Sequence, residues 1–480
     1  MKQLNNKIRT RFAPSPTGDP HIGNIRSALF EYLFAKANGG DFLLRIEDTD
    51  QSRYIEGSVE MILNSLAWLG IKPDNLNNIV YQSKRLEKYK EAALKLLQED
   101  KAYICTCSKE RLEELRKEQE AKKLPTGYDG HCRDNRIQIA DNSQLEEYLS
   151  KGVVVRMKMP EKGKIKFIDM IRGEVEFDLS LIDDQVLLKS DGFPTYHLAH
   201  IVDDAEMEIT HVIRGEEWLS STPKHLVLWE MLSKKAPQYA HLPLIFGSDK
   251  KKLSKRHGAM SVMEYKAAGY LPEAMVNFLV FLGWNPKDER EIFSLEELEE
   301  EFKIENINKA PAVFDVMKLN SLNEHYIRDG FMNDESRIMD LLADFEFKNI
   351  SKGEIELLSR GGYSTLIEAA EEILNLRKTP EYDGKTLIFK KSTKENTLSG
   401  LQIAHSQLSE IDEKDWNSQE LQMRLGLIVE RNDLTNGDVF WPVRVALSGR
   451  EKSPSPVELL IALGKKESIN RLEKAIRNLK

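Results

Sequence analysis

The chain has 480 residues, 41% hydrophobic and 31% charged, which is the composition of an ordinary globular protein of three or more domains. Its most apolar run, residues 278–284, is too short to cross a bilayer, and residues 1–7 lack a signal-peptide core, so we expect a cytoplasmic protein with no membrane partner. The net charge of −9 does not exclude nucleic acid, because phosphate contacts are local and basic side chains cluster at 250–256 and 465–480.

The first 90 residues alternate strand and helix patterns, which indicates an α/β domain with a parallel sheet. Residues 42–46 are strand-like, and apolar residues recur at helical spacing over 25–34, over 58–69 and after Lys84. The loop 14–24, Pro-Ser-Pro-Thr-Gly-Asp-Pro-His-Ile-Gly-Asn, leads into the first of these helices. Unpaired N–H groups and the helix dipole favour an anion at such a position, so this loop suits a triphosphate.

The three cysteines lie in one short window, at Cys105, Cys107 and Cys132. An odd number of cysteines within so short a segment predicts a metal site better than it predicts disulfides, although three buried free thiols are the alternative. The window belongs to a mixed segment, about 95–190, with a charged helix pattern at 108–122 and a strand pattern at 153–159. We interpret this segment as an insertion into the α/β domain.

The α/β character returns over residues 190–245, with strand patterns at 186–189 and 211–214, so one sheet is expected to continue after the insertion. The following Lys-Leu-Ser-Lys-Arg segment, 252–256, places two ammonium groups three residues apart on a short loop. Together with the loop 14–24, it could hold a polyphosphate from both ends. Helical periodicity dominates from about residue 250, and prolines near 455 mark the start of the last helix.

The two loops resemble the HIGH and KMSKS signatures of class I aminoacyl-tRNA synthetases. Four further segments are similar to bacterial glutamyl-tRNA synthetases, namely RFAPSPTG at 11–18, RIEDTD at 45–50, KSDGFPTYHLA at 189–199 and RGEEWL at 214–219. The resemblance covers essentially the whole chain, and these motifs occur in the expected order.

The resemblance implies an α/β fold, in which a Rossmann-type catalytic domain is split by an inserted acceptor-stem-binding domain. All-α stem-contact and anticodon-binding domains are expected to follow. The implied boundaries are 1–95 and 189–248 for the two catalytic halves, 96–188 for the insertion with a zinc knob, 249–330 for the stem-contact domain and 331–480 for the anticodon-binding domain.

The activity implied is that of a glutamate–tRNA ligase, which activates L-glutamate with ATP and transfers it to the 3′ end of tRNA(Glu). The resemblance implies that His21, Lys252 and Lys255 act in catalysis, with Mg²⁺ helping to offset the charge that develops on the phosphates. The implied nucleotide-binding residues are His21, Gly23, Asn24, Glu217, Trp218, Lys255 and Arg256. Asn24 stands where the signature has its second histidine.

The glutamate pocket implied by the resemblance consists of Arg11, Ser15, Glu47, Tyr196, His200 and Arg214. Arginine forks suit the two carboxylates of glutamate, Glu47 suits the ammonium group, and Tyr196 is expected to donate its hydroxyl. His200 follows Tyr196 by four residues, where relatives carry asparagine, so its role is open. A structural ion pair between Arg45 and Glu47 is the alternative for that part of the motif.

The cysteine spacing matches the Cys-x-Cys-x24-Cys pattern of zinc-containing members of the family, and three thiolates need a fourth ligand for a closed tetrahedral site. The candidates are Asp134, two residues after the last cysteine, and Tyr128, four residues before it. Such a zinc ion would be structural, because a closed site leaves no position for a reactant.

A monomer that uses tRNA(Glu) is the expected form, and two rival functions are open. The first is a relaxed enzyme that also charges tRNA(Gln), because Gly362 aligns where discriminating members tend to carry arginine, although an interhelical turn explains this glycine equally well. The second is a catalytically silent RNA-binding relative. The intact His21 loop and the Lys252–Arg256 loop speak against the silent relative, since it would need neither.

Overall fold

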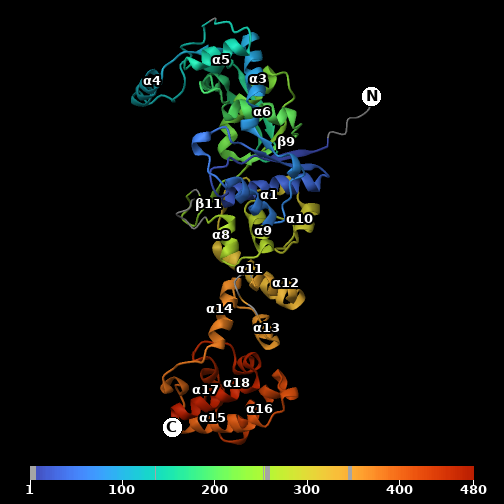
Figure 1. Cartoon of the computed structure of the whole chain (residues 1–480), viewed down its shortest axis with the longest axis vertical. Helices are drawn as coiled ribbons and strands as arrows, with labels where there is room; N and C mark the ends of the chain where they lie inside the picture. The colour runs from blue at the N-terminus through green and yellow to red at the C-terminus, as the bar shows by residue number, and fades with distance from the viewer. Residues whose placement is uncertain (1–6, 136, 252, 254–259, 344–346, 348) are drawn as a thin grey trace. The chain divides into compact units, whose positions relative to one another are not determined.

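The computed structural model describes residues 7–480 except 136, 252, 254–259, 344–346 and 348. The chain forms two compact units (Figure 1). The first unit consists of Met1–Tyr265 with Met275–Asp315, and the second of Lys266–Ala274 with Val316–Lys480. The predicted stem-contact domain, 249–330, is therefore divided between the two units, and the five-domain division stays a prediction.

Parallel strands form the centre of the first unit, in the order β3-β2-β1 and then β9-β10. The N–H of Thr210 donates to the carbonyl of Arg9 at 3.0 Å, so β9 lies beside β1 and continues the sheet. The chain thus adds strands on one side of β1 first and on the other side later, as in a doubly wound fold. The bounds are β1 Arg9–Phe12, β2 Asp41–Ile46, β3 Val80–Tyr81, β9 His211–Gly215 and β10 Gln238–Leu242.

The helix predicted over 25–34 is confirmed as α1, Ile22–Ala37, which packs against β1, β2 and β9. The apolar positions that defined the pattern, among them Ile25, Leu29 and Leu33, are all buried. His21 caps the helix, because its Nδ1 accepts the N–H of Gly23 at 3.1 Å. The predicted helices at 58–69 and after Lys84 are α2, Ser58–Trp68, and α3, Leu86–Gln98.

The inserted segment folds around an antiparallel sheet of order β4-β5-β8. The strand predicted at 186–189 therefore belongs to this sheet and not to the parallel one, because Val186 and Leu188 pair with β5. The insertion shares one apolar core with α3, α6 and α7 of the catalytic part. The bounds are β4 Ala102–Cys105, α4 Lys109–Ala121, α5 Asn142–Ser150, β5 Val154–Met157, β8 Val186–Leu188, α6 Tyr196–Glu206 and α7 Thr222–Met231.

A β-hairpin connects the insertion to the parallel sheet. Its strands β6, Lys164–Asp169, and β7, Gly173–Asp178, are antiparallel to each other, and the end of β6 pairs with β10 through Asp169 and Tyr239. The rest of the first unit contains β11 Ile245–Phe246, which pairs with β12 Ala312–Val313, and the helix α10 Leu295–Glu301. The helices α8 Val262–Ala267 and α9 Pro272–Phe281 each have residues in both units.

The second unit is helical, and its described residues form no strand. Glycine allows the backbones of two helices to come close together in this unit. A Cβ built on Gly400, in the helix α15, would lie 2.1 Å from the carbonyl oxygen of Asp438, in the helix α17. Figure 1 shows α15 to α18 packed together at the C-terminal end. The bounds are α11 Val316–Asn333, α12 Glu335–Ala343, α13 Lys352–Leu358, α14 Leu366–Arg377, α15 Lys394–Ser409, α16 Ser418–Arg431, α17 Asn436–Ser448 and α18 Pro456–Leu479.

The predicted start of the last helix is confirmed, since α18 begins at Pro456 with a capping box formed by Ser455 and Glu458. Among the described residues, no helix is long and apolar enough to cross a membrane.

Candidate active site

A pocket of about 420 Å³ lies at the carboxyl ends of β1 and β9. These are the neighbouring strands between which the strand order reverses, and open α/β sheets bind their ligands at such a point. Most of the predicted substrate and nucleotide residues line this pocket: Arg11, Ser15, His21, Gly23, Asn24, Glu47, Tyr196, Arg214, Glu217 and Trp218. Segments more than 200 residues apart in the chain therefore form one site.

The N-terminus of α1 forms one wall of the pocket. His21 is exposed, and its ring lies close to Gly23, because a Cβ built on Gly23 would come within 3.1 Å of His21 Cε1. Glycine at this position therefore leaves the backbone accessible beside the histidine ring. The N–H of Gly23 itself donates to the histidine ring, so anion binding by the loop 14–24 stays a prediction.

The predicted residues Lys252, Lys255 and Arg256 lie outside the described residues. Leu253, in the same loop, is described; its N–H donates to the carbonyl of Ile245 at 2.9 Å, and its side chain lines the pocket.

Arg214, next to the last residue of β9, has a buried guanidinium that bonds only neutral groups among the described residues. Nη1 donates to the hydroxyl of Tyr196 at 3.2 Å and Nε to Nε2 of His241 at 3.1 Å. Nη2 donates to Oγ1 of Thr222 at 2.9 Å and to Nδ1 of His225 at 3.3 Å. The positive charge of this arginine is held in place but is not neutralised by a carboxylate in direct contact.

Arg11 has the opposite environment, although it also lines the pocket. Its Nε donates to Asp204 at 3.2 Å and its Nη1 to Glu31 at 3.4 Å. Burial lowers the pKa of Arg11, but the two carboxylates outweigh burial, so its pKa is raised. The charge of Arg11 is therefore largely shared with acidic side chains of the protein itself.

The ion pair between Arg45 and Glu47, which is the alternative for this motif, is present, with Nη2 and Oε1 separated by 3.0 Å. Arg45 is fully buried and also bonds Asp204 at 2.5 Å, and the two arginines on Asp204 hold the pKa of that carboxyl at about 2 against the effect of burial. Burial raises the pKa of Glu47. Glu47 still lines the pocket, so the structural ion pair and a ligand contact are compatible.

Tyr196 lies between aromatic rings. Its ring stacks on His200 at a centroid distance of 4.5 Å and lies 4.3 Å from the ring of Trp218. His200 is fully buried, its Nδ1 bonds the carbonyl of Tyr196 at 2.7 Å, and its Nε2 has no hydrogen-bond partner among the described residues. His200 does not line the pocket, and it supports Tyr196 from behind.

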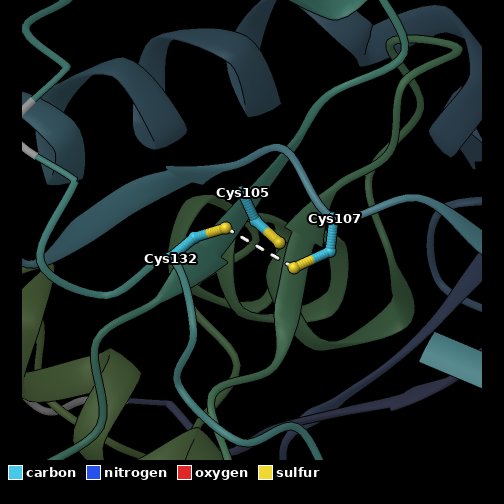
Figure 2. A group of neighbouring side chains, drawn as sticks. All are labelled: Cys105, Cys107 and Cys132. Carbon is cyan, nitrogen blue, oxygen red and sulfur yellow. Dashed lines mark hydrogen bonds between the residues drawn. The ribbon is translucent and has the colours of Figure 1, made fainter. Parts of the chain in front are cut away.

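The three predicted cysteines converge at the end of β4, and Figure 2 shows their thiols pointing toward one another. Their sulfur atoms lie within 4.8 Å of one another. The hydroxyl of Tyr128 lies 3.5 Å from Cys105 Sγ and 3.6 Å from Cys107 Sγ, whereas Asp134 is exposed and is not part of the cluster. The donor set is three sulfurs and one phenol oxygen, which fits a tetrahedral thiolate-rich metal.

Sequence reasoning missed several residues that surround Arg214, namely Asp169, Thr222, His225 and His241. They come from β6, α7 and β10, and none lies in a recognisable motif. The available signal was weak: His241 is a single histidine within an apolar strand, a pattern that ordinary core residues share.

Comparison with known proteins gives two family matches. The family of class I tRNA synthetases (E and Q), catalytic domain, matches residues 7–321, and the anticodon binding domain matches residues 337–476. A glutamate–tRNA ligase from Dehalococcoides mccartyi is 45% identical, with 99% of this chain and 98% of the relative covered. Glutamate–tRNA ligase 2 from Thermoanaerobacter pseudethanolicus is 43% identical, with 98% of each chain covered.

Among solved structures, a glutamate tRNA ligase from Elizabethkingia meningosepticum in complex with its amino acid is similar to this chain. The TM-score is 0.85 at 34% sequence identity, and the match covers 99% of this chain and all of the other.

Proposed function

The chain belongs to the class I tRNA synthetases for glutamate and glutamine and is a glutamate–tRNA ligase, and from this premise we propose which side chains bind each substrate. In the reaction, the α-carboxylate of glutamate attacks the α-phosphorus of ATP and releases pyrophosphate. The terminal adenosine hydroxyl of tRNA then attacks the carbonyl carbon of glutamyl-adenylate and releases AMP. ATP, L-glutamate and tRNA therefore all have to reach the pocket at the carboxyl ends of β1 and β9.

Arg214 binds the side-chain carboxylate of glutamate in this proposal. The supporting observation is its buried guanidinium, which bonds a tyrosine, a threonine and two histidines but no carboxylate among the described residues. A ligand carboxylate supplies the missing negative charge, whereas the neutral amide of glutamine would leave the arginine buried and uncompensated. The hydroxyl of Tyr196 holds one side of the guanidinium and lies at the pocket wall.

Glu47 and Arg11 bind the amino-acid end of the substrate. Glu47 faces the pocket with a carboxylate that suits the ammonium group, and Ser15 is exposed in the same pocket. Because Arg11 already bonds Asp204 and Glu31, we assign it a weaker electrostatic role than Arg214.

The nucleotide occupies the other side of the pocket, where the N-terminus of α1 favours the phosphates. His21, Gly23 and Asn24 contact the phosphates and the ribose in this arrangement, while Glu217 and Trp218 flank the adenosine. Mg²⁺ bound to ATP would offset charge on the departing pyrophosphate. We assign the same purpose to the ammonium groups of Lys252 and Lys255, which follow from the sequence motif alone.

A structural zinc ion suits the cysteine cluster, with Cys105, Cys107, Cys132 and Tyr128 as its four ligands. The proximity of the Tyr128 hydroxyl to two of the thiols supports tyrosine over Asp134. Metal analysis should give one zinc per chain, and Tyr128→Phe should lose zinc to a chelator faster than Asp134→Asn. The reverse order would assign Asp134, and much less than one zinc would refute the site.

Specificity for tRNA is tested by charging tRNA(Glu) and tRNA(Gln) in parallel. Gly362 has a φ of +92°, and a side chain there would be strained, so the turn by itself accounts for the glycine. We therefore favour an enzyme that charges tRNA(Glu), and charging of both tRNAs would establish the relaxed alternative.

The glutamate assignment is tested with Arg214→Gln in ATP–pyrophosphate exchange with tRNA present. Removing a charge-assisted contact to a buried carboxylate should lower kcat/KM for glutamate by about 100-fold or more. The KM for ATP should change little. A variant with a near-normal KM for glutamate would refute the role of Arg214.

A further inference from the structure

Asp169, His241 and Arg214 form a continuous chain of hydrogen bonds that ends at the pocket. Oδ2 of Asp169 lies 2.6 Å from Nδ1 of His241, and Nε2 of His241 accepts the Nε–H of Arg214 at 3.1 Å. Asp169 and His241 are fully buried, and neither lines the pocket. We propose that Asp169 and His241 are positioning residues for glutamate selection, because they hold the guanidinium of Arg214 in the orientation that meets the substrate carboxylate.

The fold places these three residues with little freedom. His241 and Arg214 are direct neighbours in the parallel pairing of β10 with β9. Asp169 ends β6, which pairs with β10 at Tyr239. Oδ1 of Asp169 also accepts the N–H groups of Ile171 at 3.0 Å, Arg172 at 2.8 Å and His241 at 3.3 Å. These three bonds fix the carboxylate, so that only Oδ2 faces the imidazole.

The hydrogen bonds also determine the tautomer of His241. Arg214 can only donate, so Nε2 of His241 must be the acceptor and the proton must sit on Nδ1. The carboxylate of Asp169 accepts that proton and thereby selects this tautomer. The contacts of Thr222 agree with this tautomer. Its Oγ1 accepts a hydrogen bond from Arg214 and lies 3.2 Å from Nε2 of His241, which can accept the hydroxyl proton.

An intervening neutral histidine has an electrostatic consequence. Asp204 contacts Arg11 directly and shares its charge, whereas Asp169 reaches Arg214 only through the imidazole. The arginine is thus oriented by a carboxylate without forming an ion pair with it, and its charge stays available to a ligand. This inference rests on the proposed contact between Arg214 and glutamate.

The groups around His241 keep it neutral. The charged groups that face it are Asp169, Arg214 and Arg172, whose Nε donates to the His241 carbonyl at 3.4 Å, and the ring of Tyr239 stacks on it at 6.1 Å. Burial and the two arginines lower the pKa of His241 more than Asp169 raises it. Protonation would place a second N–H against Arg214, so selection of glutamate should weaken only in acid, below the lowered pKa of His241, and not at the ordinary histidine value of about 6.5.

The test is the isosteric variant Asp169→Asn. Its amide oxygen keeps the three backbone N–H bonds, which leaves the NH₂ group facing Nδ1 of His241. The imidazole must then accept at Nδ1 and carry its proton on Nε2, where it opposes the Nε–H of Arg214. We expect the KM for glutamate to rise by about 10- to 100-fold. The KM for ATP should stay within about twofold of the wild-type value, in keeping with a loss confined to the amino-acid end of the pocket.

A second variant separates positioning from folding. His241→Gln offers an amide oxygen near the position of Nε2, so it can accept from Arg214 with no tautomer to select. Glutamate binding should be largely retained, and adding Asp169→Asn in this background should change the KM for glutamate less than twofold, which is the non-additivity expected of coupled residues. Asp178→Asn, on the partner strand of the same hairpin, is the matched control, since among the described residues its carboxylate accepts hydrogen bonds from Ser180 alone.

The outcomes distinguish this inference from the proposed function. An unchanged KM for glutamate in Asp169→Asn, with a strong loss in Arg214→Gln, would overturn the positioning role and leave the glutamate assignment intact. Unchanged kinetics in both variants would overturn both. Equal losses for ATP and glutamate in Asp169→Asn, or full additivity of the double variant, would show a structural role only and would also overturn the inference.

Discussion

Three neighbouring histidines behind the pocket should make the first unit sensitive to mild acid. His197, His200 and His225 lie on α6 and α7, with ring centroids 4.2 Å apart for the closest pair. Nδ1 of His225 faces the donor Nη2 of Arg214, so the proton of His225 sits on Nε2 and is donated to Nδ1 of His197 at 3.0 Å. The rings of His197 and His225 are thus hydrogen-bonded in their neutral forms.

The size of the effect follows from His197. Burial, then the cations of Lys224 and Arg214, lower its pKa to about 4, while Asp183 opposes them. In the unfolded chain, the histidine binds a proton below about pH 6.5, whereas in the folded chain it binds one only near its lowered pKa. Unfolding therefore takes up a proton at any pH between these two pKa values, and the free energy of unfolding decreases as the pH falls. Between pH 7 and pH 5, the free energy of unfolding should decrease by about 2 kcal/mol for this residue alone.

The assay compares the wild type with His197→Gln by calorimetric unfolding of the intact chain at several pH values between 5 and 7. The glutamine oxygen still accepts the Nε2–H of His225 but does not titrate. Buried carboxyls such as Glu31, whose pKa burial raises, act in the opposite sense and cancel in the comparison. The variant should take up about one proton fewer on unfolding near pH 5. Parallel stability curves for the two proteins would refute the argument.

Two further substitutions test the packing of each unit. Arg45→Met should lower the free energy of unfolding by about 3–5 kcal/mol in urea titrations, because Asp204 loses a buried cation; a loss under about 1 kcal/mol would show that Asp204 finds another partner. Gly400→Ala should cost about 1–3 kcal/mol, since its Cβ would meet the Asp438 carbonyl at 2.1 Å. Gly426→Ala, with open space around its Cβ, is the matched control and should be neutral or stabilising; equal effects of the two would contradict the close approach.

Local patterns predicted the elements of secondary structure well where the pattern was long. The helical spacing after residue 24 became α1, and the prolines near 455 began α18. The strand at 186–188 was identified as a strand but placed in the wrong sheet. A short apolar segment specifies that it is extended, but its partner depends on which edge is available in three dimensions.

The sequence by itself determined the family and the roughly ten residues that meet in the pocket, because the motifs have a fixed order and each carries its own chemistry. It could not show which of Arg11 and Arg214 offers more positive charge to a ligand, because both are arginines in motifs that match the family. Only the tertiary structure decided that Arg11 lies against Asp204 whereas Arg214 lies against His241. The physical reason is that the charge an arginine offers to a ligand depends on the groups within hydrogen-bond distance, and strand register and helix packing bring those groups from distant parts of the chain.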